Sequence, residues 1–167
     1  MAKEITTPRI GAHVPTSGGM ATRSIEYAQT IKAEVIQVFA SSPRTWATSA
    51  PNPAMDEAFK TKTGELDIET YVHASFLINL GSPTTSTYEN SLSATEYSLK
   101  RGREIGAQGV VVHTGSAVDE NHVAKAWKQI HEGKPQGHDL VSLVRRNPLG
   151  AAAGVTIEAL PLAVDNE

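Results

Sequence analysis

Short apolar runs alternate along the chain with longer segments in which apolar residues recur every three or four positions. The short runs are rich in β-branched and aromatic residues and predict buried strands at residues 10–13, 35–39, 70–73 and 110–113. The longer segments have helical periodicity and predict helices at residues 20–33, 55–62, 88–105 and 119–130. Asp119 stands where a side chain would cap the last of these helices.

This alternation of strand and helix predicts βαβ units, with a parallel sheet and helices packed outside it. A (β/α)8 TIM barrel and an open doubly wound sheet both fit such a pattern. The loop after the first strand contains Gly18-Gly19 but no complete glycine-rich dinucleotide or phosphate-binding motif. The fold class expected is therefore α/β, and nucleotide binding of the common glycine-loop kind is not indicated.

The pattern changes after residue 131, where glycine and proline interrupt the chain and only residues 155–158 again form a strand-like run. We therefore expect a single domain over residues 1–167, with a half-barrel at 9–131 and a divergent tail at 132–167. A complete barrel typically takes ~250 residues. The chain is accordingly expected to form a partial (β/α)8 TIM barrel, with four βα repeats and possibly a fifth strand, that stops before closing. A homodimer or a complementary fragment would cover its open edge.

Composition and charge narrow the function classes. The net charge of −3 argues against bulk electrostatic binding of nucleic acid, so any DNA contact must come from local basic loops. Cysteine is absent, which leaves His, Asp and Glu as metal ligands. No apolar run approaches the ~20 residues of a membrane span, and the N-terminus lacks the layout of a secretory signal. A cytoplasmic protein without a membrane partner is expected.

Three predicted strands end in a side chain that can bind a metal, namely His73, His113 and Glu158. The carboxyl ends of parallel strands lie at one edge of a sheet, and neighbouring strands are ~4.8 Å apart. Two His and one Glu form a known catalytic zinc set that leaves a position for water, whose pKa zinc lowers. A structural reading, in which each histidine only caps a strand end, remains open beside this one.

Four sequence motifs, in this order, resemble those of the endonuclease IV family. They are IGAHV at 10–14 followed by Gly18-Gly19, QVF at 37–39 running into PRTW at 43–46, HASFLINLGSP at 73–83, and VVHTGS at 111–116. The resemblance covers residues 10–116 and implies a xylose-isomerase-like TIM barrel. It further implies a zinc-dependent hydrolase that cuts DNA 5′ to abasic sites in base excision repair.

The resemblance also implies metal ligands. His73 and His113 correspond to zinc-binding histidines of the family. Glu158 is the best match to its metal-bridging glutamate and would be the catalytic carboxylate. The turn after Glu158 departs from the polar, glycine-rich family pattern, and the family's later ligand motifs are absent. This chain alone would therefore hold at most one Zn²⁺. His13 is expected to be structural or to support a metal ligand without binding the metal itself.

DNA contacts are implied for two loops. Arg44, with Trp46 in the same loop, would touch the DNA backbone. Phe76 would stack into the gap left by the missing base, at a position where the family often has tyrosine. The basic residues Lys100, Arg101 and Arg103 are expected on the solvated face of a helix.

Two other functions remain open. A sugar isomerase or epimerase of related barrel architecture also places metal at strand ends, although the PRTW loop and the LINLG motif favour the nuclease. A non-catalytic remnant that serves as a partner-binding module fits the missing ligands, since fold alone does not establish a working site.

Overall fold

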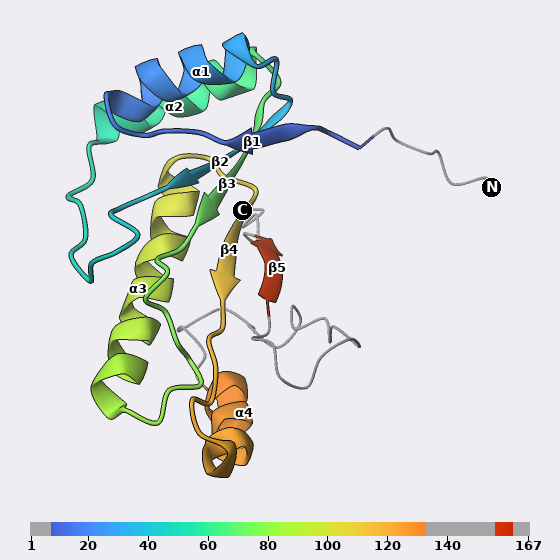
Figure 1. Ribbon diagram of the computed structural model, residues 1–167. Helices are drawn as coiled ribbons and strands as arrows, with labels where there is room; N and C mark the ends of the chain where they lie inside the picture. Colours follow the sequence, from blue (N-terminus) through green and yellow to red (C-terminus); the bar gives the residue numbers. More distant parts are fainter. Residues whose placement is uncertain (1–7, 133–155, 162–167) are drawn as a thin grey trace, which may run out of the picture.

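A computed structural model of the protein describes residues 8–132 and 156–161 (Figure 1). Its five-stranded sheet has the order β1-β2-β3-β4-β5, in which the first four strands are parallel neighbours. These parallel strands lie where the sequence predicts them: β1 Gly11–His13, β2 Val35–Phe39, β3 Glu69–His73 and β4 Gly109–His113. Each strand is thus next to its neighbour in sequence, as in the first half of a (β/α)8 barrel. The predicted partial barrel is confirmed.

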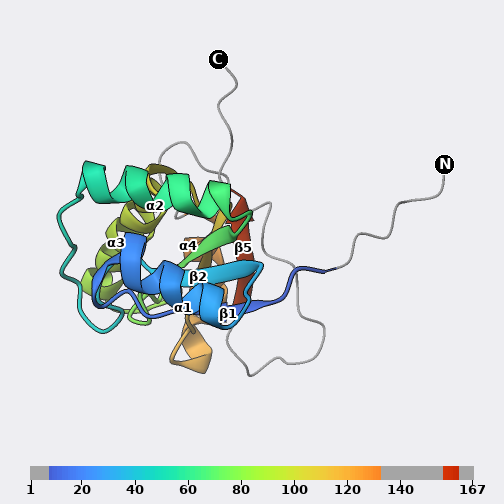
Figure 2. The ribbon, with the colours of Figure 1, turned by 90° about the horizontal axis from the view of Figure 1, so that it is seen from above.

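The helices follow the strands in alternation. They are α1 Ile25–Thr30, preceded by a π-helical turn η1 Gly19–Ser24; α2 Pro53–Glu65; α3 Thr85–Glu104; and α4 Val123–Glu132, preceded by a 3-10 turn η2 Glu120–His122. Helices α1 and α2 contact each other, and α3 runs along β3 and β4 (Figure 1). Seen from above, α1, α2 and α3 gather on one side and β5 lies on the other (Figure 2). None of the helices within the described ranges is long and apolar enough to cross a bilayer.

The core lies between the helices and one face of the sheet. Burial alternates along β2 and β3, so that Ile36, Val38, Thr70 and Val72 are buried while the residues between them are half-exposed. This alternation arises because successive strand residues point to opposite faces. Large side chains from both layers fill the space between them, including Phe59, Leu80, Leu99, Ile105, Val110 and Val112. The helices therefore cover one face of the sheet, and the other face is the one that would line a barrel.

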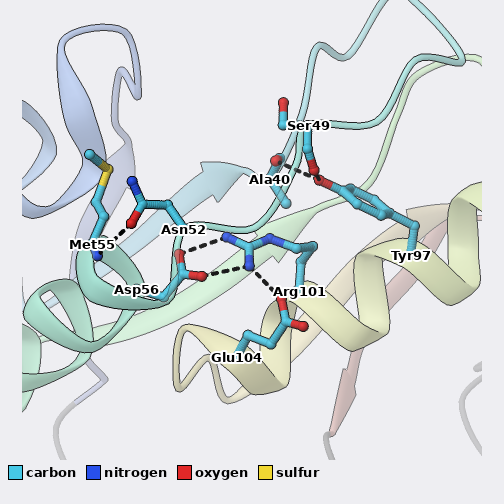
Figure 3. A network of polar contacts seen from close by, with 8 residues as sticks. All are labelled: Ala40, Ser49, Asn52, Met55, Asp56, Tyr97, Arg101 and Glu104. Carbon is cyan, nitrogen blue, oxygen red and sulfur yellow. Dashed lines mark hydrogen bonds and ion pairs between the residues drawn. The ribbon is translucent and has the colours of Figure 1, made fainter.

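Helix α2 is longer than its apolar periodicity predicts. It begins at Pro53, whose missing N–H costs nothing in the first turn. The side chain of Asn52 caps it by accepting a hydrogen bond from the Met55 backbone N–H at 3.2 Å (Figure 3). Asp119 likewise caps the turn before α4 by accepting from the Asn121 N–H at 2.8 Å, as expected.

The fifth strand differs from the expectation. Strand β5 spans Thr156–Pro161 and runs antiparallel to β4, with Thr156 opposite His113 and Pro161 opposite Gly109. The expectation of a strand that ends at Glu158 and extends the parallel sheet is therefore wrong. Glu158 lies in the interior of β5, and its side chain is outside the described part of the protein. The remainder of the predicted tail, at residues 133–155 and 162–167, is also outside it.

Arg101 was expected in solvent together with Lys100 and Arg103, and for Arg101 this is wrong. It is 5% exposed and donates two hydrogen bonds to the carboxylate of Asp56 on α2, at 2.7 and 2.8 Å. A further hydrogen bond reaches Glu104 (Figure 3). The guanidinium lies on the side of α3 that α2 covers, which helical charge patterning alone does not reveal. Lys100 and Arg103 are exposed as expected.

Candidate metal centre

Each of the four parallel strands ends in an aromatic ring. These rings belong to His13 on β1, Phe39 on β2, His73 on β3 and His113 on β4. Because the strands are parallel, the rings gather at one edge of the sheet, where α/β folds place their functional groups. Ring centroids are 4.4 Å apart for His13 and Phe39, 5.2 Å for Phe39 and His73, and 5.1 Å for His73 and His113. The row is thus continuous across all four strands.

His73 and His113 face each other through their Nε2 atoms, which are 3.2 Å apart. Zinc binds imidazole nitrogen at about 2.0–2.1 Å, so two imidazoles on one tetrahedral ion have nitrogens roughly 3.3 Å apart. The observed separation therefore fits two ligands of a single zinc ion with little movement of either ring. This geometry is what the strand-end pattern of the sequence predicts.

The orientation of the His73 ring is set by its own backbone. Its Nδ1 lies 2.7 Å from the carbonyl oxygen of Ala74, so Nδ1–H donates there and leaves the Nε2 lone pair directed at His113. Burial lowers the pKa of His73, and the nearby His113 and His13 lower it further, against the opposing effect of the Ala74 hydrogen bond. His73 is therefore biased toward the neutral form that binds metal.

Backbone hydrogen bonds hold the two histidine-bearing segments together. The Ala74 N–H donates to the carbonyl of Val111 at 2.9 Å, and the Leu80 N–H donates to that of Thr114 at 2.8 Å. These bonds continue the β3–β4 pairing beyond the ends of the strands. They keep His73 and His113 at a fixed separation.

Asn79 and Gly115 make a second link that was not identified from the sequence. The side-chain oxygen of Asn79 accepts hydrogen bonds from the N–H groups of Gly81 at 3.1 Å and Ser116 at 3.0 Å. Gly115 has φ +88°, and a Cβ atom there would lie 2.1 Å from the Asn79 oxygen. Only glycine fits this approach. The signals in the sequence were the Asn of the LINLG motif and the Gly of the HTGS turn, but their contact is not visible before folding.

An open groove of about 490 Å³ lies beside His113. It runs between the β3–α3 loop and the β4–α4 loop, and it is lined by Phe76, Leu77, Ile78, Asn79, Thr87, His113, Gly115 and Ser116. Apolar side chains therefore adjoin amide and hydroxyl groups next to the histidine pair. Such a mixed surface suits a ligand with both a flat apolar part and polar oxygens.

Phe76, which its apolar neighbours would place in the core, is 54% exposed. Its ring centroid lies 5.2 Å from those of both Phe39 and His73 in edge-on contacts, so it packs against the two middle rings of the row. More than half of this side chain is therefore open to solvent.

Arg44 and Trp46 lie in the β2–α2 loop beside this surface. Arg44 is exposed and forms no hydrogen bond or ion pair with any residue that the structure describes, and Trp46 is 38% exposed. The carbonyl of Pro43 accepts hydrogen bonds at 3.0 Å from the Phe76 N–H and the Ser75 hydroxyl. The two loops proposed to contact DNA are thus joined next to Arg44.

A third ligand is not found among residues 8–132 and 156–161 as far as their side chains are described, where no cluster of three His, Asp or Glu residues could hold a metal. The Nδ1 atom of His13 lies 3.1 Å from the side-chain oxygen of Gln37, and its ring centroid lies 6.3 Å from that of His73. The sequence-based candidate for this position, Glu158, stays a prediction.

Comparisons with known proteins place these features in context. The family of xylose isomerase-like TIM barrels matches residues 25–133. The protein of Streptomyces coelicolor named "Probable endonuclease 4" is 49% identical over 123 residues, which are 74% of this chain and 42% of the relative. The "Endonuclease 4" of Thermus thermophilus is 34% identical over 126 residues, which are 74% of this chain and 46% of the relative. The chain therefore spans less than half the length of these relatives.

Solved structures agree. Endonuclease IV from Thermus thermophilus matches with a TM-score of 0.62 and 31% identity, over 73% of this chain and 45% of that one. A xylose isomerase domain protein from Planctomyces limnophilus matches with a TM-score of 0.53 but only 15% identity, over 77% of this chain and 50% of that one. The second likeness shows the fold alone and does not favour sugar chemistry.

Proposed function

The chain belongs to the xylose isomerase-like TIM barrel family, within its endonuclease IV group, and on this premise we propose that it serves zinc-dependent cleavage of DNA 5′ to abasic sites in base excision repair. The observation that carries the proposal is the 3.2 Å approach of the Nε2 atoms of His73 and His113. Since the chain spans less than half of its endonuclease relatives, the activity of a whole endonuclease is part of the proposal.

In this proposal His73 and His113 hold one zinc ion, and Glu158 is the third ligand and catalytic carboxylate. Bound zinc would supply an acidified water as nucleophile and stabilise the charge on the departing oxygen. The protein's own contribution is to present two imidazoles at the separation the ion requires. The Ala74 carbonyl and the Asn79–Gly115 contact fix that separation before the metal binds.

DNA is held by the neighbouring loops. The exposed guanidinium of Arg44 binds a backbone phosphate, for which its planar donors are well suited. Trp46 adds contact area in the same loop. Phe76 offers its ring to the cavity left by the missing base, where stacking is worth about 1–3 kcal/mol. Phe76 contacts the ring of His73, and the backbone of Phe76 is bonded to Pro43, next to Arg44, so we propose that the two loops bind the DNA beside the metal.

One edge of the sheet is exposed. The edge expected to be open, at the last parallel strand, is paired with β5. Strand β1 forms another edge of the sheet, all three of its residues are exposed, and the preceding Ile10 is 73% exposed. We propose that a second copy or a complementary fragment covers this edge. A particle of one chain's mass in light scattering at micromolar concentration would argue against the second copy. The cytoplasmic location expected from the sequence stays a prediction.

The test combines metal content with nicking of an oligonucleotide that carries a single abasic analogue. The native chain is compared with His113→Ala and with His122→Ala, a control in which the removed ring contacts Gln129 away from the site. Zinc-dependent nicking that is lost in His113→Ala and kept in His122→Ala supports the proposal. Turnover of sugars without nicking would support an isomerase or epimerase instead. A metal-free, inert chain would leave a binding module.

A further inference from the structure

Tyr97 on α3 forms hydrogen bonds to the loop between β2 and α2, residues 40–52. The hydroxyl of Tyr97 lies 2.9 Å from the carbonyl oxygen of Ser49 and 3.3 Å from that of Ala40 (Figure 3). A hydroxyl has one hydrogen to donate, so the bond to Ser49 is the main one and Ala40 shares it weakly. The side chain of Tyr97 thus contacts both the first part of the loop, at Ala40, and its later part, at Ser49.

This contact closes the loop around Arg44. Closing a loop removes conformations that its tip would otherwise sample. The carbonyl of Pro43 is already held by the loop that carries Phe76. With Ser49 tied to Tyr97, the segment that contains Arg44 and Trp46 is fixed on both sides.

Tyr97 stands on a rigid support. Arg101 follows one helical turn later on α3 and is joined to Asp56 at the start of α2 by two buried hydrogen bonds. The part of α3 that carries Tyr97 is therefore held in place, and so is its hydroxyl group. Burial raises the pKa of Tyr97, so its hydroxyl remains protonated and able to donate at neutral pH.

We propose that Tyr97 is a positioning residue for DNA binding, because its hydrogen bond to Ser49 keeps the β2–α2 loop in the shape that presents Arg44 to a phosphate. The inference rests on the proposed function, in which Arg44 contacts DNA. A loop ordered before binding loses less freedom on association, so the benefit appears as affinity. Zinc binding, which depends on β3 and β4, does not depend on this contact.

The rate of proteolysis measures how well the β2–α2 loop is held. Arg44 is the sole lysine or arginine between Lys32 and Lys60, so tryptic cleavage after it reports on this segment alone. Tyr97→Phe removes only the hydroxyl, and the matched control is Tyr27→Phe on α1, whose hydroxyl has no hydrogen-bond partner among the described residues. We expect faster cleavage after Arg44 in Tyr97→Phe, with zinc content and melting temperature close to native, and native behaviour in Tyr27→Phe.

DNA affinity is measured by fluorescence anisotropy with an abasic-analogue oligonucleotide. Loss of one hydrogen bond predicts a Kd about three- to tenfold higher for Tyr97→Phe. In an Arg44→Ala background the same substitution should change Kd no further, because Tyr97 acts through Arg44. A general loss of stability would lower affinity in both backgrounds.

The outcomes separate the two proposals. Unchanged cleavage together with an unchanged Kd in Tyr97→Phe would overturn the positioning role, as would an equal loss of affinity with and without Arg44. If the native chain binds no abasic DNA while Tyr97→Phe is still cut faster after Arg44, the bracing of the loop stands and the nuclease proposal fails.

Discussion

The ion pairs between α2 and α3 and the histidine pair at the strand ends differ in the charges of the groups that face each other. Arg101 faces two carboxylates, those of Asp56 and Glu104, and each is within hydrogen-bond reach. His73 and His113 face each other with no opposite charge between them among the described residues. Their Nε2 atoms form a hydrogen bond when one of them carries a proton, and a bound cation would take the place of that proton.

The difference separates a set of paired charges from a pair of rings that could share a cation. The Asp56–Arg101–Glu104 cluster is complete, and burying it stabilises the helix layer only while every partner is present. The histidine pair is held in place by backbone contacts from β3 and β4, independently of any bound ion. Under the proposed function, the ion-pair cluster serves stability and the histidine pair binds metal, and substitutions should separate the two.

The largest effect is expected where a buried charge loses its partner. Arg101→Met leaves Asp56 buried without a cation, which should cost about 3–5 kcal/mol of unfolding free energy. Urea denaturation followed by circular dichroism measures it, with the exposed Lys100→Met as control. Zinc affinity of the folded fraction should stay near native. A variant as stable as the native protein would show that this pair contributes nothing.

Removing a proposed metal ligand should lower zinc affinity and leave the unfolding free energy nearly unchanged. His73→Ala is expected to lower zinc affinity by about a hundredfold or more, since loss of even an indirect partner of a ligand costs 10–100-fold. Competition with a chromogenic chelator measures the affinity. Urea denaturation in the presence of a strong chelator should show little change from native. Native zinc affinity in His73→Ala would remove this histidine from the site.

Gly115 is expected to affect both stability and zinc binding, because its backbone conformation shapes the turn next to His113. Gly115→Ala forces a side chain into a backbone with φ +88° and against Asn79. We expect a loss of about 1–3 kcal/mol in unfolding free energy together with weaker zinc binding. Gly64→Ala is the matched control, since a Cβ there meets nothing within 4 Å on α2. That control should be neutral or gain about 0.5–1 kcal/mol.

The smallest effect concerns the helix cap beside the ion pairs. Asn52→Ala removes the acceptor for the Met55 N–H and should lower the unfolding free energy by about 1 kcal/mol. Asn52→Asp keeps an acceptor and should behave like the native protein in the same thermal or urea unfolding measurement. Equal losses in both variants would point to a role other than capping.

Local patterns sufficed for much of this architecture. Apolar runs located β1 to β4 because strand formation depends on nearby side chains, and the same runs marked His73 and His113 at their ends. The burial of Arg101 was missed since it depends on α2 packing against α3, 45 residues away in sequence. The exposure of Phe76 was implied by the family resemblance alone, because a short apolar run does not reveal which face a residue lies on.

The amino-acid sequence by itself determined the strand–helix alternation, the metal-binding residue types at the strand ends and the family motifs. These depend on residues close together in the chain. Tertiary structure alone decided that the Nε2 atoms of His73 and His113 meet, that Asn79 packs on Gly115 and that β5 runs antiparallel to β4. Such contacts join segments distant in sequence, and their geometry exists only once the sheet has assembled.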